Sequence, residues 1–126
     1  MQVFKSKGFA KFARKERIAD QRLCDAVTGA EHGQVDADYG GGVIKQRIAR
    51  PGEGKSGGYR SIILFRRGVR AFFVYGFAKS DRANIDKSDE QDFKELAKAL
   101  LAASDQELRR LITQGEFLEV TCHEEE

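Results

Sequence analysis

Two apolar, β-rich runs joined by a two-residue turn constrain this chain more than any other feature. Residues 59–66 are apolar on both faces, as a central strand must be, and residues 69–77 follow the dipeptide Arg67-Gly68. Residues 43–48 alternate apolar and cationic side chains, which is typical of a half-buried strand. We therefore predict three consecutive antiparallel strands at the centre of the domain.

In the run 69–77, strict alternation predicts two distinct faces, because successive side chains of a strand point to opposite sides. Phe72 and Val74 are expected on one face, and the other face is expected to pack as core. The residues of that core face are Ala71, Phe73, Tyr75 and Phe77.

Helical patterns occur on both sides of the predicted sheet. Apolar residues recur at helical spacing within residues 1–28 with an interruption near Ala19, which fits two short helices or one kinked helix. Ser88-Asp-Glu-Gln91 and Ser104-Asp-Gln-Glu107 match the capping box, so we expect two helices within residues 88–114, starting at these serines.

The remaining segments complete the expected architecture. Residues 29–42 are rich in Gly and Asp and are expected to form a loop. Residues 117–126 are either an edge strand or a frayed tail. The prediction is an α+β domain, in which a small antiparallel sheet within residues 43–82 packs against a helical hairpin at residues 1–28 and a C-terminal helical segment.

Composition sets the size and the setting of the domain. A chain of 126 residues, 40% hydrophobic, is expected to form a single domain over residues 1–126 that folds without disulfides or a structural metal. Cys24 and Cys122 are therefore expected to be reduced and Cys24 to have no nucleophilic role. No apolar run approaches the length of a membrane span, and charges replace the apolar region of a signal peptide, so we expect a cytoplasmic protein without a membrane partner.

Familiar catalytic and metal-binding motifs are absent from the sequence. His32 and His123 lie far apart and lack a Cys or His at ligand spacing, so no metal site is predicted. Gly52-Glu-Gly-Lys-Ser56 ends like a P-loop but lacks its first glycine, because Ala49 stands there, which argues against nucleotide hydrolysis.

The charge of the chain is concentrated in its middle. Residues 1–44 carry seven basic and six acidic side chains (+1), residues 45–82 carry ten and two (+8), and residues 86–126 carry five and twelve (−7), giving the net charge of +2. A segment at +8 is the footprint expected of a surface that meets phosphates. The acidic segment fits the solvated faces of the C-terminal helices.

Basic and aromatic side chains are interleaved in the middle segment, a combination that favours single-stranded RNA as a ligand. Aromatic rings stack on unpaired bases while Arg and Lys hold phosphates. Arg66, Arg67 and Arg70 flank the turn and fit a solvated hairpin tip. The cations expected to converge on one patch are Lys45, Arg47, Arg60 and Lys79, with Lys55 reaching over it.

These residues give the segment a resemblance to the RelE/HigB superfamily of bacterial type II toxins. The resemblance covers residues 43–102 and lies in Lys55-Ser-Gly-Gly-Tyr-Arg60, the apolar hairpin, and Phe73-Val-Tyr-Gly-Phe-Ala-Lys79, with Asp81-Arg82 just beyond. The stretch from Arg50 to Arg60 resembles a HigB-like branch. A RelE-like fold is implied.

The resemblance implies a ribosome-dependent messenger RNA endonuclease that uses no metal and no cofactor. In such enzymes the 2′-hydroxyl of the RNA attacks, so the site must supply a base, positive charge for the phosphorane, and a proton donor to the 5′ oxygen. Because the basic patch contains no histidine or carboxylate in sequence, the base is expected to be a lysine whose pKa is lowered by neighbouring cations.

Roles follow by position in the resemblance. Lys45 and Arg47 match the basic pair that holds phosphates or acts as base, Arg60 matches the arginine that stabilises the transition state, and Lys79 matches the lysine that closes the last strand. All four are predicted to be catalytic.

Other positions are expected to bind RNA or to depart from the family pattern. Ser80 stands where some members place a second catalytic arginine, and Ala83-Asn-Ile-Asp86 lacks the tyrosine of some relatives. The proton donor to the leaving 5′ oxygen is therefore left open between Arg82 and Lys55. Tyr59 is either a stacking platform or a buried strand residue. The residues assigned to RNA binding are Arg50, Lys55, Tyr59 and Arg82.

Two other functions remain open at this point. A ParE-like toxin on the same fold would inhibit DNA gyrase without cutting RNA, and a non-catalytic nucleic-acid-binding module would use the same patch for affinity alone. The expected partners are messenger RNA on the ribosome and a helix-turn-helix, HigA-like antitoxin, which would present carboxylates to the basic patch.

Overall fold

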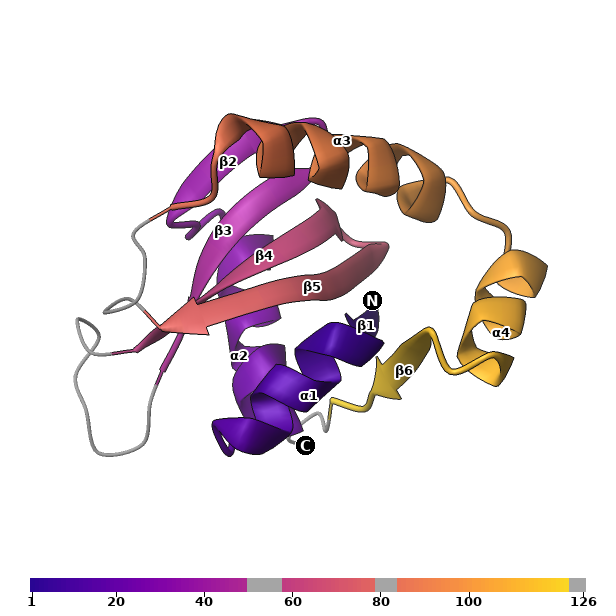
Figure 1. The fold of residues 1–126 in the computed structure, drawn as a ribbon, viewed down its shortest axis with the longest axis horizontal. Coiled ribbons are helices and arrows are strands. Elements are labelled where there is room, and N and C mark those ends of the chain that lie inside the picture. Colours follow the sequence, from indigo (N-terminus) through magenta and orange to yellow (C-terminus); the bar gives the residue numbers. More distant parts are fainter. Residues whose placement is uncertain (50–57, 79–83, 123–126) are drawn as a thin grey trace.

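The computed structural model describes residues 1–49, 58–78 and 84–122. Within these parts of the chain, six strands form one sheet in the order β2-β3-β4-β5-β1-β6 (Figure 1). The strands are β1 (Gln2–Ser6), β2 (Ala37–Gly40), β3 (Val43–Ile48), β4 (Tyr59–Arg66), β5 (Arg70–Ala78) and β6 (Phe117–Val120). The helices are α1 (Lys7–Lys15), α2 (Asp20–Glu31), α3 (Lys87–Leu101) and α4 (Asp105–Thr113).

The α+β class and the three central antiparallel strands are confirmed, but the sheet is larger than predicted. β1 pairs in parallel with β5 and antiparallel with β6, so the sheet is mixed rather than antiparallel. β2 pairs with β3 in the segment predicted as a loop. Both missed strands are only four or five residues long. β1 pairs with strands far away in the chain, so its own segment carries no pattern that predicts the pairing. Of the two alternatives for residues 117–126, the edge strand is correct for β6.

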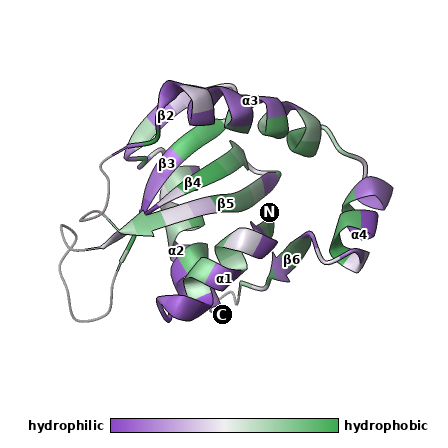
Figure 2. Cartoon of the chain, in the orientation of Figure 1, coloured by the Kyte–Doolittle hydropathy of each residue, from purple (hydrophilic) through white to green (hydrophobic). Residues whose placement is uncertain are grey.

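Helices cover both faces of the sheet (Figure 1). α1 and α2 pack with one core cluster, and α3 and α4 contribute to a second cluster on the opposite face. In Figure 2 the central strands are mostly hydrophobic, whereas α3 alternates between hydrophilic and hydrophobic residues, as expected of a helix that covers a sheet with one side. No helix in the described ranges is long and apolar enough to cross a membrane.

The helix starts follow from capping chemistry. The capping box predicted at Ser104 is present, since Ser104 accepts from the Glu107 amide and Glu107 accepts from the Ser104 amide. The predicted cap at Ser88 is wrong by two residues. Asp86 caps α3 by accepting from the Asp89 amide at 2.8 Å, and an aspartate serves as well as a serine in this position.

A β-bulge in β5 overturns the predicted faces of that strand. Ile62 lies opposite Tyr75 and Ile63 opposite Phe73, which makes Val74 the extra residue. Because one inserted residue shifts the alternation, the side chains beyond it change face. Phe73 packs in the cluster of α1 and α2, whereas Tyr75 and Phe77 join the cluster of α3. The predicted common face of these three aromatics is therefore wrong.

The two cysteines form a disulfide, contrary to the expectation of reduced thiols. Cys24 in α2 and Cys122 just after β6 are bonded, with their Cα atoms 5.6 Å apart. The two cysteines are 98 residues apart in sequence, and no local sequence pattern predicts that the end of β6 lies next to α2. The bond ties the C-terminal edge strand to the helical layer on one face.

We predict that this disulfide contributes substantially to stability. Closing so long a loop restricts the unfolded chain and is worth about 4–5 kcal/mol in the chain-entropy account. The Cys24→Ser, Cys122→Ser double variant should therefore melt about 10 °C or more below the parent chain. Dithiothreitol should lower the Tm of the parent chain and leave the double variant unchanged, as measured by circular dichroism. Equal Tm values for both proteins without reductant would contradict the prediction.

Candidate functional site

The start of β4 brings the predicted cations into register. Arg47 of β3 lies directly opposite Arg60 of β4, and Ile48 lies opposite Tyr59. A Cβ on Gly58 would lie 2.5 Å from the Ile48 carbonyl oxygen, so only a glycine lets the chain enter β4 this close to the end of β3. The Gly-Tyr-Arg sequence thus places two arginines side by side on one face of the sheet.

A single carboxylate holds these cations together. Asp36 directly precedes β2, and its Oδ2 lies 3.2 Å from Arg60 Nε and 3.4 Å from Lys45 Nζ. Its Oδ1 lies 3.5 Å from Arg47 Nε. We call these four residues the Asp36 cluster. Like charges directly opposite on neighbouring strands repel, and the shared carboxylate offsets that repulsion.

The members of the cluster differ in their access to solvent. The Arg47 side chain is 49% exposed, whereas that of Lys45 is 12% and that of Arg60 only 5% exposed. Arg60 also donates through Nη1 to the Tyr59 carbonyl at 3.4 Å. Arg60 therefore acts as an internal anchor for Asp36, while Arg47 is the cation most accessible to a ligand.

A tyrosine joins the site from β2. The Tyr39 hydroxyl donates to Asn84 Oδ1 at 2.6 Å, and Lys45 Nζ donates to the same oxygen at 3.2 Å. Burial raises the pKa of Tyr39 above its ordinary value, and the negative charges of Glu90 and Asp36 raise it further. Tyr39 therefore stays a protonated donor beside Lys45. Residues 83–86 contain no tyrosine, but Tyr39 of β2 contacts Asn84 in this segment.

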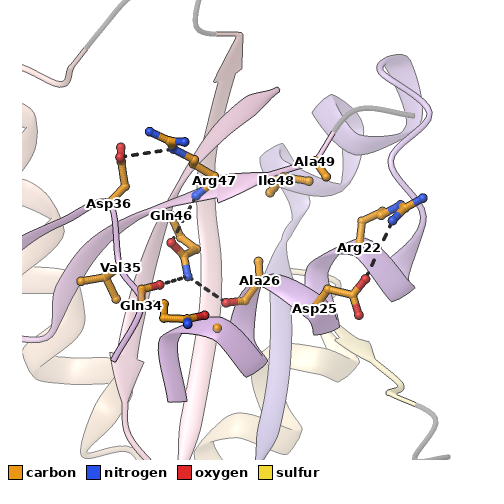
Figure 3. Close-up of a pocket in the computed structure, with 11 residues that line it drawn as sticks. Arg22, Asp25, Ala26, Gln34, Val35, Asp36, Gln46, Arg47, Ile48 and Ala49 are labelled. Carbon is orange, nitrogen blue, oxygen red and sulfur yellow. Dashed lines mark hydrogen bonds and ion pairs between the residues drawn. The ribbon is translucent and has the colours of Figure 1, made fainter. Parts of the chain in front are cut away.

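A cleft of about 540 Å³ opens beside the cluster, between α2, the end of β3 and the chain that leads into β2 (Figure 3). Gln46 spans its interior, because its Nε2 donates to the Gln34 carbonyl at 2.7 Å and to the Ala26 carbonyl at 3.0 Å. Asp36 and Arg47 contribute to the wall of the cleft, but their ion pair lies on the opposite side of β3 from Gln46, because successive side chains of a strand point to opposite faces (Figure 3). The other lining residues are Arg22, Asp25, Ala26, Gly29, Gln34, Val35, Gln46, Ile48 and Ala49.

Of the four residues predicted to be catalytic, the structure brings together Lys45, Arg47 and Arg60. Tyr59 is 3% exposed and packs edge-on against Phe12, so its buried alternative is correct and its ring is not available for stacking on a base. Lys79, Arg50, Lys55 and Arg82 lie outside the described residues.

Arg70 is not part of a solvated hairpin tip, although Arg66 and Arg67 are exposed. Its side chain is 10% exposed and lies 3.3 Å from Asp105 Oδ1. It also donates to the carbonyls of Leu100 and Ala103 at the end of α3. Arg70 therefore stabilises the α3–α4 junction rather than offering a charge to a ligand.

Sequence reasoning missed the carboxylate at the centre of the site. Asp36 belongs to the glycine-rich segment predicted as a loop, and the basic patch was therefore expected to contain no acid. Gly40, Gly41 and Gly42 all have positive φ and form the turn between β2 and β3. Reading these glycines as a hairpin turn would have paired residues 37–40 with β3 and placed Asp36 next to Lys45.

Comparison with known protein families identifies the family of the chain. The sequence matches the family model described as RelE toxin of RelE / RelB toxin-antitoxin system over residues 1–120. The chain is therefore a toxin of a toxin-antitoxin system. It belongs to the RelE toxin family, and this membership implies an antitoxin partner. No curated protein matched the sequence.

The environment of Tyr39 generates a prediction about its titration. Replacing Glu90 with Gln removes a negative charge that opposes the phenolate, so the pKa of Tyr39 should fall toward its ordinary value. The shift is measurable by NMR on ¹³C-labelled tyrosine, with Tyr39→Phe identifying the resonance. Glu95→Gln, five residues further along α3, serves as the control. An unchanged pKa of Tyr39 in the Glu90 variant would refute the contribution assigned to the Glu90 charge.

Proposed function

We propose that this toxin cleaves messenger RNA bound to the ribosome, with the 2′-hydroxyl of the RNA as nucleophile and without a metal or cofactor. The observation that carries the proposal is the convergence of Lys45, Arg47 and Arg60 on the Asp36 carboxylate, with the Arg47 side chain half exposed to solvent. Cations fixed in this way can stabilise the extra negative charge of a pentacoordinate phosphorane without reorganising during the reaction.

The exposure of each cation suggests its part. Arg47, half exposed at the edge of the cleft, is suited to contact the scissile phosphate through its guanidinium. Lys45 adds a second charge from the same strand and lies two residues away. Arg60 is nearly buried, so its charge acts on the phosphate across a poorly screened interior, and its main contacts are with Asp36 and the Tyr59 carbonyl.

The other family assignments remain part of the proposal. Lys79 follows β5, whose last residue Ala78 lies opposite Tyr59, and it is proposed as a further catalytic cation. Arg50, Lys55 and Arg82 are proposed to bind the RNA. The proposed setting is the cytoplasm, and the proposed partner is a HigA-like antitoxin that neutralises the basic cluster with carboxylates.

Cell-free translation tests the proposal directly. The purified toxin is added to reactions with and without ribosomes, and new 5′ ends on the messenger are mapped by primer extension. Cuts that require ribosomes would support the proposal, and cuts on naked RNA would limit it to a general ribonuclease. Intact messenger would exclude it and turn attention to DNA gyrase, whose inhibition is read from supercoiling assays.

We predict that Arg47→Ala slows messenger cleavage by about 100-fold or more, because it removes a charge that stabilises the transition state. Its side chain is half exposed, so the Tm should change little. Arg67→Ala is the matched control, since it removes the same charge from the exposed turn after β4. Equal cleavage rates for the two variants would contradict a specific role for Arg47.

A further inference from the structure

We propose that Asp36 is the general base that removes the proton from the attacking 2′-hydroxyl, an inference that rests on the ribonuclease function proposed above. A base must be unprotonated when the substrate binds. Aspartate is ordinarily ionised at neutral pH, whereas a lysine is ordinarily protonated and must first lose a proton. Within the described residues, Asp36 is the carboxylate that contacts Lys45, Arg47 and Arg60 together.

The geometry places this carboxylate where the reacting atoms would lie. Asp36 Oδ1 is 3.5 Å from Arg47 Nε, so a phosphate contacting Arg47 has its neighbouring ribose hydroxyl within reach of Asp36. The Arg47 side chain beside it is 49% exposed, so a phosphate can approach this pair from solvent. The Asp36 side chain is 18% exposed and remains reachable from solvent.

Asp36 is also held firmly enough to act as a base. Its backbone N–H donates to the Lys45 carbonyl at 3.0 Å, which fixes the chain at the entry to β2. Its side chain is anchored from behind by the nearly buried Arg60. A base held by both its backbone and its carboxylate needs little reorganisation to meet the hydroxyl.

The chemical step balances with these groups alone. Asp36 takes the proton of the 2′-hydroxyl, the O2′–P bond forms, and the P–O5′ bond breaks with its electron pair leaving on O5′. The departing oxygen takes a proton from the solvent, and Asp36 later returns its own proton to the solvent. The products are a 2′,3′-cyclic phosphate and a 5′-hydroxyl.

A different role for the same carboxylate predicts the opposite behaviour. Asp36 could occupy the cations in place of a phosphate and so restrain the toxin. Its removal would then strengthen RNA binding and increase cleavage, whereas loss of a base abolishes cleavage and leaves binding intact. The rate of chemistry measured apart from binding distinguishes the two roles.

The test compares Asp36→Asn with Asp38→Asn, which makes the same charge change two residues away in β2. Single-turnover cleavage of ribosome-bound messenger gives the rate of chemistry. Binding is measured with a messenger that carries a 2′-deoxynucleotide at the cleavage position and cannot be cut. Circular dichroism checks that each variant folds, and Asp36→Glu, which keeps the carboxylate, should recover part of the activity.

We expect Asp36→Asn to cleave at least about 100-fold more slowly, with unchanged or tighter binding, and Asp38→Asn to match the parent toxin.

Three outcomes would overturn the assignment. If the parent toxin cleaves messenger and Asp36→Asn cleaves it as fast or faster, Asp36 is not the base, while the ribonuclease function stands. Weakened binding, or no recovery of cleavage in Asp36→Glu, would mark Asp36 as structural. If the parent toxin cuts no messenger, the proposed ribonuclease function fails, and the role of Asp36 falls with it.

Discussion

The Asp36 carboxylate is the contact on which the arrangement of the site depends. Arg47 and Arg60 lie directly opposite each other, and Lys45 projects from the same strand face. Without an anion between them, these cations would repel one another at a position where Arg60 is also withdrawn from water. Breaking a buried ion pair by removing one partner typically costs about 3–5 kcal/mol, because the remaining charge is left uncompensated. The carboxylate therefore holds the three cations in place, in addition to its proposed role as base.

Two arginines are buried in the part of the chain that the structure describes, and they show why a count of charges does not define a site. Arg70 and Arg60 are similarly withdrawn from solvent, at 8% and 4% exposure. Arg70 meets the carbonyls that end α3, an ordinary way to stabilise a helix C-terminus. Arg60 instead meets a carboxylate that it shares with Lys45 and the half-exposed Arg47. The partners of a cation, rather than its presence in a basic segment, separate the structural arginine from the functional candidate.

Sequence reasoning succeeded where the structure is determined locally and failed where it is determined by distant contacts. The strands β3, β4 and β5 follow from alternation and turn chemistry, and the Ser104 capping box follows from four consecutive residues. β1 depends on β5 and β6, and the Val74 bulge depends on how β5 meets β4, so neither had a signature in its own segment. Asp36 was missed for the same reason, because it comes next to Lys45 only when the turn between β2 and β3 forms.

The order of the strands in the sheet affects how the newly synthesised chain can fold. Among the described strands, β1 precedes the other five in the chain and lies between β5 and β6, and β6 follows all the others. The sheet therefore cannot be completed until β6 has been synthesised, because the pairing of β1 with β6 closes a long loop. A newly made chain passes through a stage with β1 exposed as an open edge. During that stage, an antitoxin already present would meet a toxin that has not finished folding.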